Sequence, residues 1–167
     1  MDVIIRLVEP QEYSGLGELT AQTYLDDGLL AFGKDDPYLP VLRDTAGRAA
    51  QSDVLVAVDG SGRILGGVAF TLGARPYADV AREDEAEFRM LVVATEARKR
   101  GIGEALVMAC LERARAVDGC HRLVLSTDQQ MHAAHRIYER MGFVRTPDRD
   151  WSPFAELDPL LTYALEL

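Results

Sequence analysis

The sequence has few cysteines, and this limits the chemistry open to it. Its 167 residues include only Cys110 and Cys120. Neither thiol has the spacing of a metal-ligand pair, and so few cysteines are typical of a reducing compartment. We therefore expect a cytoplasmic protein without a bound metal, whose core forms without disulfide bonds.

Positive charge is also scarce. The chain carries 18 lysines and arginines against 27 aspartates and glutamates, a formal net charge of −9 at pH 7. Nucleic acids and anionic membranes bind basic surfaces, so this balance argues against both as partners. No stretch approaches the length of a membrane span, and the opening residues MDVIIRLVEP predict a strand rather than a secretion signal.

No repeat, linker or low-complexity tract divides the chain. We therefore expect one domain over residues 1–167, long enough to bury its own core. The first half predicts a strand at 3–8, helices at 12–30 and about 39–50, strands at 54–58 and 64–72, and a loop at 73–84. The residues DGSG between the two later strands are typical of a hairpin.

The second half alternates strands and helices. We expect a strand at 87–93, a helix from Gly101 that ends at Gly119, a strand at 121–126, a helix at 131–141 and a last strand at 160–167. In the first of these strands, Phe88, Met90 and Val92 are expected on one face. Gly142 should end the second helix as a left-handed cap. These elements predict an α/β fold with one mixed sheet covered by helices.

The segment ATEARKRGIGEAL (94–106) places three cations and two glycines at the start of a predicted helix. The first amides of a helix have no internal partner, and the helix dipole favours negative charge there. Glycine lets the backbone approach a bulky oxyanion, so the turn predicts a site for a phosphate-bearing ligand. The alternative is a tight connection with solvated cations.

Two common nucleotide-binding motifs are incomplete at this turn. The dinucleotide fingerprint requires a third glycine or alanine where the chain has Leu106, and Asp128 is a poor match to its acidic partner. The P-loop requires Gly-Lys-Ser/Thr, which does not follow these glycines. Both absences argue against NAD and ATP as ligands.

A third pattern is complete. Arg98-x-x-Gly101-x-Gly103 closely resembles the pyrophosphate-binding motif of the GNAT superfamily of N-acetyltransferases, and a strand ending at Val93 precedes it. The later segment AHRIYERMGF resembles the second signature of that family, Ala-x-x-x-Tyr-x-x-x-Gly-Phe. Two motifs in the right order and separation make coincidence a poor explanation. The resemblance is specific over residues 87–144 and extends loosely to the whole chain.

The resemblance implies both a fold and a cofactor. The implied fold is a single α/β domain with a mixed, mostly antiparallel sheet of about 6–7 strands and about four helices, in which two central strands splay to form a CoA cleft. Acetyl-CoA is the implied acyl donor, and no metal is implied. The implied cofactor-binding residues are Leu91, Val92, Val93, Arg98, Lys99, Arg100, Gly101, Ile102 and Gly103. In this arrangement the amide-rich arm of CoA pairs with the first splayed strand.

The resemblance also implies catalytic roles. Tyr138 corresponds to the residue that protonates the departing CoA thiolate in many members, and a phenol of pKa about 10 keeps its proton at neutral pH. The alternative for Tyr138 is a packing role in the core. Glu87 is the expected base for the attacking amine, directly or through water, and Glu85 and Asp84 are its rivals. Each of these acids could instead be an ordinary surface residue.

Some positions depart from the family pattern. Met131 stands where many members have asparagine, so a polar contact to the CoA arm is missing or comes from Ser126 or Asp128. Ser126 also stands where members that acetylate ribosomal proteins carry a glutamate, which weakens that substrate assignment. His132 and His135 have a spacing that could hold a metal, but the sequence offers no third ligand.

The expected function is transfer of an acetyl group from acetyl-CoA to a primary amine of a small molecule or peptide. A non-catalytic acyl-CoA sensor and a nucleotide-binding domain are the alternatives. The acceptor stays open, although the acidic segment 81–87 hints at a cationic one. Trp151 is either a wall of the acceptor site or a cap on the core. The resemblance leaves a homodimer open as the assembly state.

Overall fold

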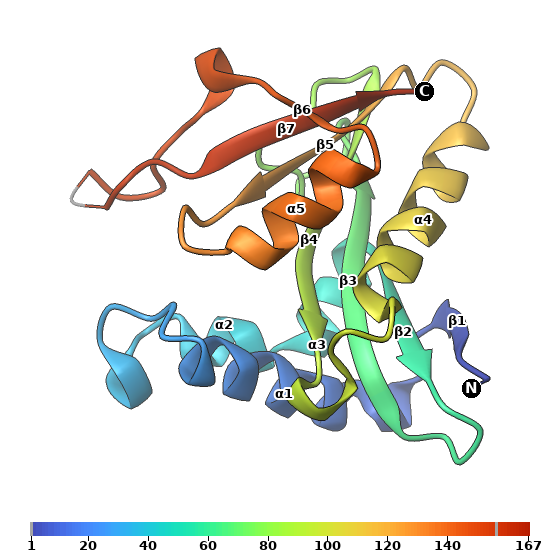
Figure 1. The fold of residues 1–167 in the computed structure, drawn as a ribbon, viewed down its shortest axis with the longest axis vertical. Helices are drawn as coiled ribbons and strands as arrows, with labels where there is room; N and C mark the ends of the chain where they lie inside the picture. The colour runs from blue at the N-terminus through green and yellow to red at the C-terminus, as the bar shows by residue number, and fades with distance from the viewer. Residues whose placement is uncertain (1, 156) are drawn as a thin grey trace.

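One seven-stranded sheet runs through the protein, in the order β1-β2-β3-β4-β5-β7-β6 (Figure 1). The computed structural model describes residues 2–155 and 157–167. The strands are β1 (Ile4–Leu7), β2 (Asp53–Val58), β3 (Ile64–Leu72), β4 (Glu85–Val93), β5 (Arg122–Thr127), β6 (Val144–Arg145) and β7 (Leu161–Glu166). Within these described ranges only β4 and β5 pair in parallel. The predicted mixed, mostly antiparallel sheet is thus confirmed.

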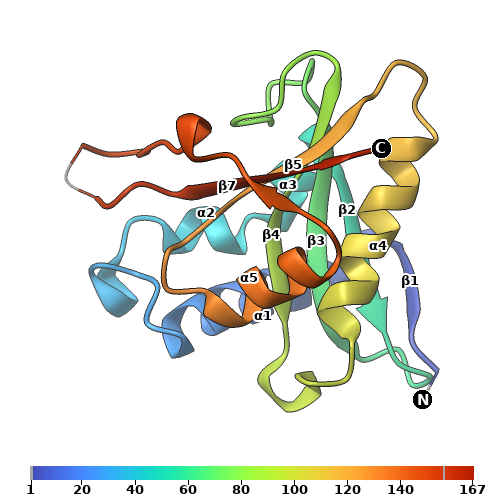
Figure 2. The ribbon, with the colours of Figure 1, turned by 45° about the horizontal axis from the view of Figure 1, so that its top comes forward.

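Five α-helices cover the two faces of the sheet in the described part of the chain (Figure 2). They are α1 (Tyr13–Asp26), α2 (Leu39–Arg43), α3 (Thr45–Gln51), α4 (Ile102–Arg115) and α5 (His132–Arg140). The larger hydrophobic core lies under α4 and α5 and includes Leu106, Leu123 and Tyr138. A smaller core lies on the opposite face, where Leu16 of α1 packs on Val56 of β2. Both faces of the sheet are therefore buried.

The helix predicted at about 39–50 is two helices, α2 and α3. The chain breaks at Asp44, whose backbone leaves the helical region and whose carboxylate accepts a hydrogen bond from the Gly47 amide at 3.0 Å. Aspartate is a preferred residue at a helix start, because its side chain satisfies one of the free amides there. Asp44 thus ends α2 and begins α3.

Strand β4 contains a β-bulge. Met90 has a φ of +58°, and Met90 and Leu91 together lie opposite Val68 of β3. The predicted alternation is wrong beyond this point, because an extra residue reverses which face the following side chains occupy. Leu91 packs against the same core as Phe88, whereas Val92 packs in the core of the opposite face.

β4 and β5 pair over a short length only. Their register runs from Glu85 opposite Arg122 to Phe88 opposite Leu125. Beyond Phe88 the two strands separate, so the edge of residues 89–93 that faces β5 has no strand partner among the described residues. The sheet therefore opens between its two parallel strands, as the expected splayed pair requires (Figure 1).

Candidate active site

A tight turn joins β4 to α4. Lys99 and Gly101 have left-handed backbones, with φ values of +64° and +77°, and α4 begins at Ile102. A left-handed conformation is strained for a residue with a side chain, and such strain persists only where the surrounding structure maintains it. Left-handed residues in a turn can direct successive N–H groups toward one point, which makes an anion-binding concavity.

The backbone N–H groups of residues 99–104 donate no hydrogen bond to any described protein group. The first bond from a helix amide comes from Ala105, which donates to the Gly101 carbonyl at 3.0 Å. Residues 99–101 at the start of this row are exposed, whereas Ile102 and Gly103 are buried. Free donors at the start of a 14-residue helix favour an anion on both hydrogen-bonding and dipole grounds.

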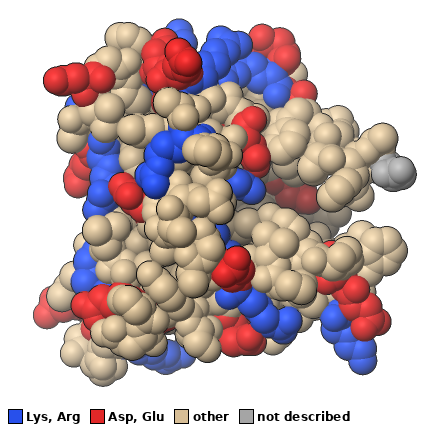
Figure 3. All heavy atoms as spheres, turned by 180° about the vertical axis from the view of Figure 1, so that it is seen from behind, with Lys and Arg blue, Asp and Glu red and all other residues tan. Residues whose placement is uncertain are grey.

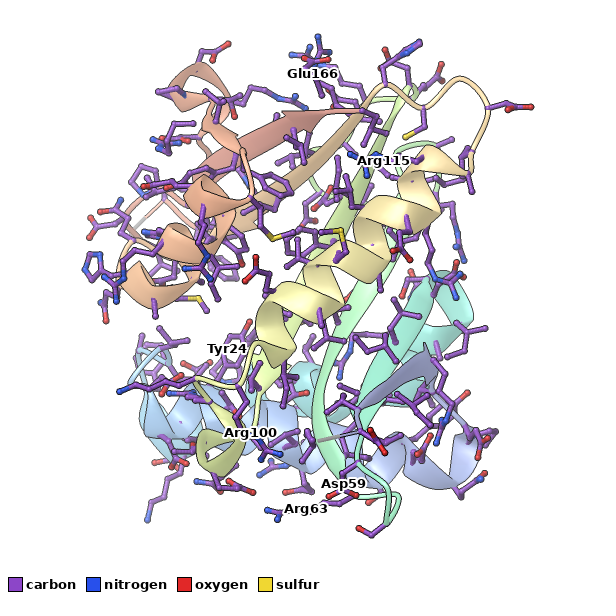
Figure 4. The ribbon with its side chains drawn as sticks, turned by 45° about the vertical axis from the view of Figure 1, so that its right-hand side comes forward. Tyr24, Asp59, Arg63, Arg100, Arg115 and Glu166 are labelled. Carbon is purple, nitrogen blue, oxygen red and sulfur yellow. The ribbon has the colours of Figure 1, made fainter. Side chains whose placement is uncertain are left out.

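The cations beside this turn are arranged unevenly. Arg98 reaches across to α1, where its Nη2 lies 2.8 Å from Oδ2 of Asp27. Lys99 and Arg100 form no ion pair with a described residue. Figure 4 shows Arg100 and Tyr24 near the N-terminal end of α4. Two unpaired cations thus adjoin the free amides.

Gly101 and Gly103 of the motif are constrained differently: Gly101 by its backbone conformation and Gly103 by the space around it. Gly101 needs its positive φ, and a Cβ added to it would meet nothing within 4 Å. Gly103 is buried in α4, and a Cβ there would lie 3.6 Å from Ile137 and 3.6 Å from Val93. A side chain at residue 103 would therefore point into the protein between β4 and α5, where only a small one has room.

A narrow cleft occupies the gap between the splayed strands. It is lined by residues 88–91 of β4, Ser126 and Thr127 of β5, Tyr24 of α1, and Met131 and Tyr138 at α5. The cleft therefore lies between the open edge of β4 and the end of β5. Sequence analysis did not predict Tyr24, because its position on α1 carries no local signal for contact with β4.

Tyr138, the expected general acid, packs in the core beside this cleft. Its ring is 3% exposed and packs edge-on against Phe88, with 5.8 Å between ring centroids. Tyr138 is one of the residues that line the cleft, and its hydroxyl forms no hydrogen bond with another described residue. Burial raises the pKa of this phenol above its ordinary value of 10, so it stays protonated at neutral pH. The Tyr138 ring thus packs in the core, and its hydroxyl remains available to donate a hydrogen bond.

A sequence model of the Acetyltransferase (GNAT) family matches residues 18–143. The chain belongs to this family. The match includes both the turn before α4 and the helix that carries Tyr138, which are the segments that hold the two motifs. The family membership and the fold expected from the two motifs are thus confirmed.

Relatives within the GNAT family are distant. Mouse N-acetyltransferase family 8 member 3 is 28% identical over 110 residues, which are 65% of this chain and 46% of that protein. A GNAT acetyltransferase from Staphylococcus aureus shares the fold over 99% of both chains, with a TM-score of 0.73 and 17% identity. A phosphinothricin acetyltransferase from Sinorhizobium meliloti, solved with acetyl-CoA, has a TM-score of 0.74 at 16% identity over 100% of this chain and 89% of that one. The chain spans about half the length of the curated relative.

The expected base, Glu87, is completely buried on β4. Its Oε1 accepts hydrogen bonds from the amides of Asp79, Val80 and Ala81 at 2.9–3.0 Å, so it anchors the β3–β4 loop. Its Oε2 is buried and has no partner among the described residues. Burial raises the pKa of this carboxyl, although the loop amides oppose the shift. Glu87 does not line the cleft.

The rival acids lie further away. Glu85 is buried and accepts from Arg149 at 2.8 Å, with Arg122 at 3.6 Å. Burial acts to raise the pKa of Glu85, but the hydrogen bonds and charge of Arg149 together with those of Arg82 outweigh it, and the net shift is downward. Asp84 is exposed on the loop. Within the acidic segment 81–87, Glu85 and Glu87 are internal, and Glu83 and Asp84 are exposed.

Trp151 lies beside the cleft. Its indole Nε1 donates to the Ser126 hydroxyl at 2.9 Å, and its backbone pairs with Leu160. The indole thus fixes the Ser126 side chain, which lines the cleft. His135, in contrast, is buried and contacts the Asp128 carbonyl through Nε2 at 2.9 Å. No group of three or more metal-ligating side chains occurs within residues 2–155 and 157–167.

A second cavity lies elsewhere. It has a volume of about 470 Å³ and lies at the opposite end of β5, lined by Arg122, Gly142, Thr146 and Arg149. Its two central arginines are already paired, Arg149 with Glu85 and Arg122 with Glu166. This cavity is therefore not the site that the two motifs form.

No helix in the described part of the chain is long and apolar enough to cross a membrane.

Proposed function

We propose that the protein transfers an acetyl group from acetyl-CoA to a primary amine of a small molecule or peptide. The observation that carries this proposal is the row of free amides at 99–104, which adjoins the unpaired edge of β4. Phosphate oxygens suit the amides, and an extended chain with its own amides suits the strand edge. Acetyl-CoA joins a pyrophosphate to such a chain, so it fits both features at once.

The cofactor contacts follow from these two features. In the proposal, the amides within 98–103 hold the pyrophosphate, and the side chains of Lys99 and Arg100 add attraction. The backbone of residues 91–93 pairs with the amide groups of the CoA arm. The fold shared with the acetyl-CoA complex from Sinorhizobium meliloti supports this placement. The thioester would then reach the cleft between β4 and β5.

The reaction requires one bond to form, one to break and one proton to reach sulfur. The amine nitrogen attacks the thioester carbonyl carbon, a C–N bond forms and the C–S bond breaks. In the proposal, the Tyr138 hydroxyl donates its proton to the departing sulfur. Burial suits it to this role, because a raised pKa keeps the phenol protonated while a thiolate, of pKa about 8.5, forms beside it.

Glu87 is the proposed acceptor of the amine proton. Its Oε2 is free of protein partners, and burial raises the pKa of the carboxyl toward the range in which a base works at neutral pH. Since Glu87 does not line the cleft, a water molecule would relay the proton. Glu85 is a poorer base, because its pKa is lowered and Arg149 occupies its oxygens.

Two measurements on one preparation test the proposal. Calorimetric titration should show saturable binding of acetyl-CoA, and a panel of primary amines should contain acceptors that release CoA thiol. The double variant Lys99→Glu/Arg100→Glu should bind acetyl-CoA at least about 10-fold more weakly, because it puts two anions beside the pyrophosphate. Arg115→Glu/Arg136→Glu is a matched control, since it reverses two exposed cations on α4 and α5 away from the turn.

The outcomes distinguish an acetyltransferase from a non-catalytic acetyl-CoA sensor. Equal loss of affinity in both double variants would mean that overall charge, rather than the turn, attracts the ligand. Tight binding of acetyl-CoA without acetylation of any amine would favour the sensor over the enzyme. Absence of acetyl-CoA binding to the parent protein would contradict the proposal as a whole.

A further inference from the structure

The charge of the cleft lining restricts which amines can enter. Arg89 is the only residue in the lining that is charged at neutral pH, and no described carboxylate lines the cleft. Burial raises the pKa of Tyr24 and of Tyr138, so both phenols are neutral hydrogen-bond donors. An amine is a cation in water, and a guanidinium repels it unless the same molecule carries a negative group.

Arg89 is held in one orientation. Its Nε lies 3.1 Å from Oδ2 of Asp79, its Nη1 donates to the Tyr77 carbonyl at 2.9 Å, and its Cζ lies 4.3 Å above the Tyr77 ring. Neither of these two contacts uses the third nitrogen, Nη2, and the Tyr38 phenol also lies beside the guanidinium. A fixed guanidinium with a free N–H pair is suited to an oxyanion, because the geometry is set before the ligand arrives.

Acidic and basic groups both lie near Arg89. Asp79 is its direct partner, and Glu87 lies two residues earlier on the same strand with one oxygen engaged by loop amides. Arg48 of α3 adds a second buried cation on this side of the sheet. It is 5% exposed, donates to the Val41 carbonyl at 2.9 Å, and has no carboxylate within 4.0 Å among the described residues.

This side of the protein is open to an acceptor. Seen from behind, the surface is hollowed between two projecting lobes (Figure 3). The lobe with the grey residue is the β6–β7 connection, which also carries Trp151 beside the cleft. Arg89 and Tyr24 line the cleft together with the open edge of β4.

We propose that the acceptor is an amine that carries an oxyanion, as an amino acid does, and that Arg89 Nη2 binds this oxyanion. The inference rests on the proposed acetyl transfer at the same cleft and names its substrate class. Arg89 is then a specificity-determining residue: it holds the anionic group so that the amine lies toward the thioester. Polycationic amines, and amines that carry no negative group, are expected to be poor acceptors, because they have no oxyanion for Arg89 to bind.

Matched acid and amide pairs test this inference. L-methionine, L-phenylalanine and L-glutamate are each compared with their α-amides, and an aminophosphonate analogue distinguishes carboxylate from phosphorus oxyanions. The acid should exceed its amide at least about 10-fold in kcat/KM in each pair that reacts. A difference in amine basicity would favour the amide instead. Without a free carboxylate, an α-amino group has a pKa of about 7.7–8.0, so less of it is protonated at neutral pH than in the amino acid.

Variants of Arg89 test whether this residue causes the preference for acids over amides. Arg89→Gln should reduce the acid-to-amide ratio to about two or less, mainly through KM, while the Kd of acetyl-CoA stays unchanged. Arg89→Lys keeps the charge opposite Asp79 and should retain part of the ratio. Arg113→Gln is the control, because it removes an arginine that pairs with Asp53 on the other side of the sheet.

A binding measurement tests the same inference without relying on catalysis. N-acetylmethionine should bind the parent protein at least about 10-fold more tightly than N-acetylmethioninamide, and Arg89→Gln should abolish this difference. Amides that react and bind as well as acids would overturn the inference while leaving acetyl transfer intact. Preferential binding of the acid without any turnover would support the anion site and contradict the proposed function instead.

Discussion

Removal of the Tyr138 hydroxyl separates catalysis from packing. In Tyr138→Phe the ring stays between Phe88, Phe143 and Tyr163, whose centroids lie 5.8–5.9 Å away. The hydroxyl forms no hydrogen bond with another described residue at the cleft, so its loss leaves no partner group unpaired. We therefore expect the free energy of unfolding to change by less than about 1 kcal/mol. Acetyl-CoA affinity should also be unchanged, because the turn lies at the other end of β4.

The turnover number should respond far more strongly. Loss of a general acid typically costs about 100-fold, which corresponds to about 2.7 kcal/mol of transition-state stabilisation. The assay is release of CoA thiol with an acceptor from the amine panel, and calorimetry supplies the Kd of acetyl-CoA from the same preparation. Tyr163→Phe is the matched control, since it removes a hydroxyl from the same aromatic cluster without a place in the cleft lining.

A clear result would refute the assignment. If Tyr138→Phe retains a rate within about twofold of the parent, the phenol contributes less than about 0.5 kcal/mol and another group protonates the sulfur. Equal rate losses in both variants would mean that the aromatic cluster, rather than one hydroxyl, supports turnover.

Three further changes test other parts of the structure. Gly103→Ala should raise the melting temperature slightly, by helix propensity of at most about 1 kcal/mol, and keep the acetyl-CoA Kd within about twofold, because its methyl group has room; a large loss of affinity would contradict this. Arg149→Met should destabilise the protein by about 3 kcal/mol at pH 7 in denaturant unfolding, because it leaves the buried Glu85 carboxylate without its main partner. Glu85 has a lowered pKa in the folded state, so its ion pair stabilises the protein above the unfolded value of 4.5 and the cost of Arg149→Met should shrink as pH falls below it. Burial raises the pKa of Cys110 to about 12, so a thiol reagent should label the native protein at Cys120 alone, and rapid labelling of both would show that α4 opens.

Features that depend on adjacent residues could be predicted from the sequence. The turn before α4 combines cations and glycines within one short segment, and the cap at Gly142 follows its helix directly, with φ of +100° in the structure. The break at Asp44 also had a local signal, since aspartate is a preferred helix start, but the prediction placed one continuous helix at about 39–50.

Features that depend on distant residues could not be predicted. The bulge at Met90 has no local signal, because methionine is not typical of a left-handed backbone, and the position is set by pairing with β3. The burial of Glu87 arises only when the loop at 79–81 folds over it. The meeting of Tyr24 with Arg89 at the cleft joins α1 to β4 across 65 residues. Strand β6, with two residues, is too short for a pattern.

Residue-resolved hydrogen exchange at the turn tests the central claim most directly. The amides of residues 99–104 have no protein acceptor, so they should exchange fast in the free protein and gain protection when acetyl-CoA is added. Amides of the β2–β3 hairpin, around Asp59, should not change and serve as the internal control. Saturation with acetyl-CoA that leaves 99–104 as fast as before, and slows exchange elsewhere, would contradict the account.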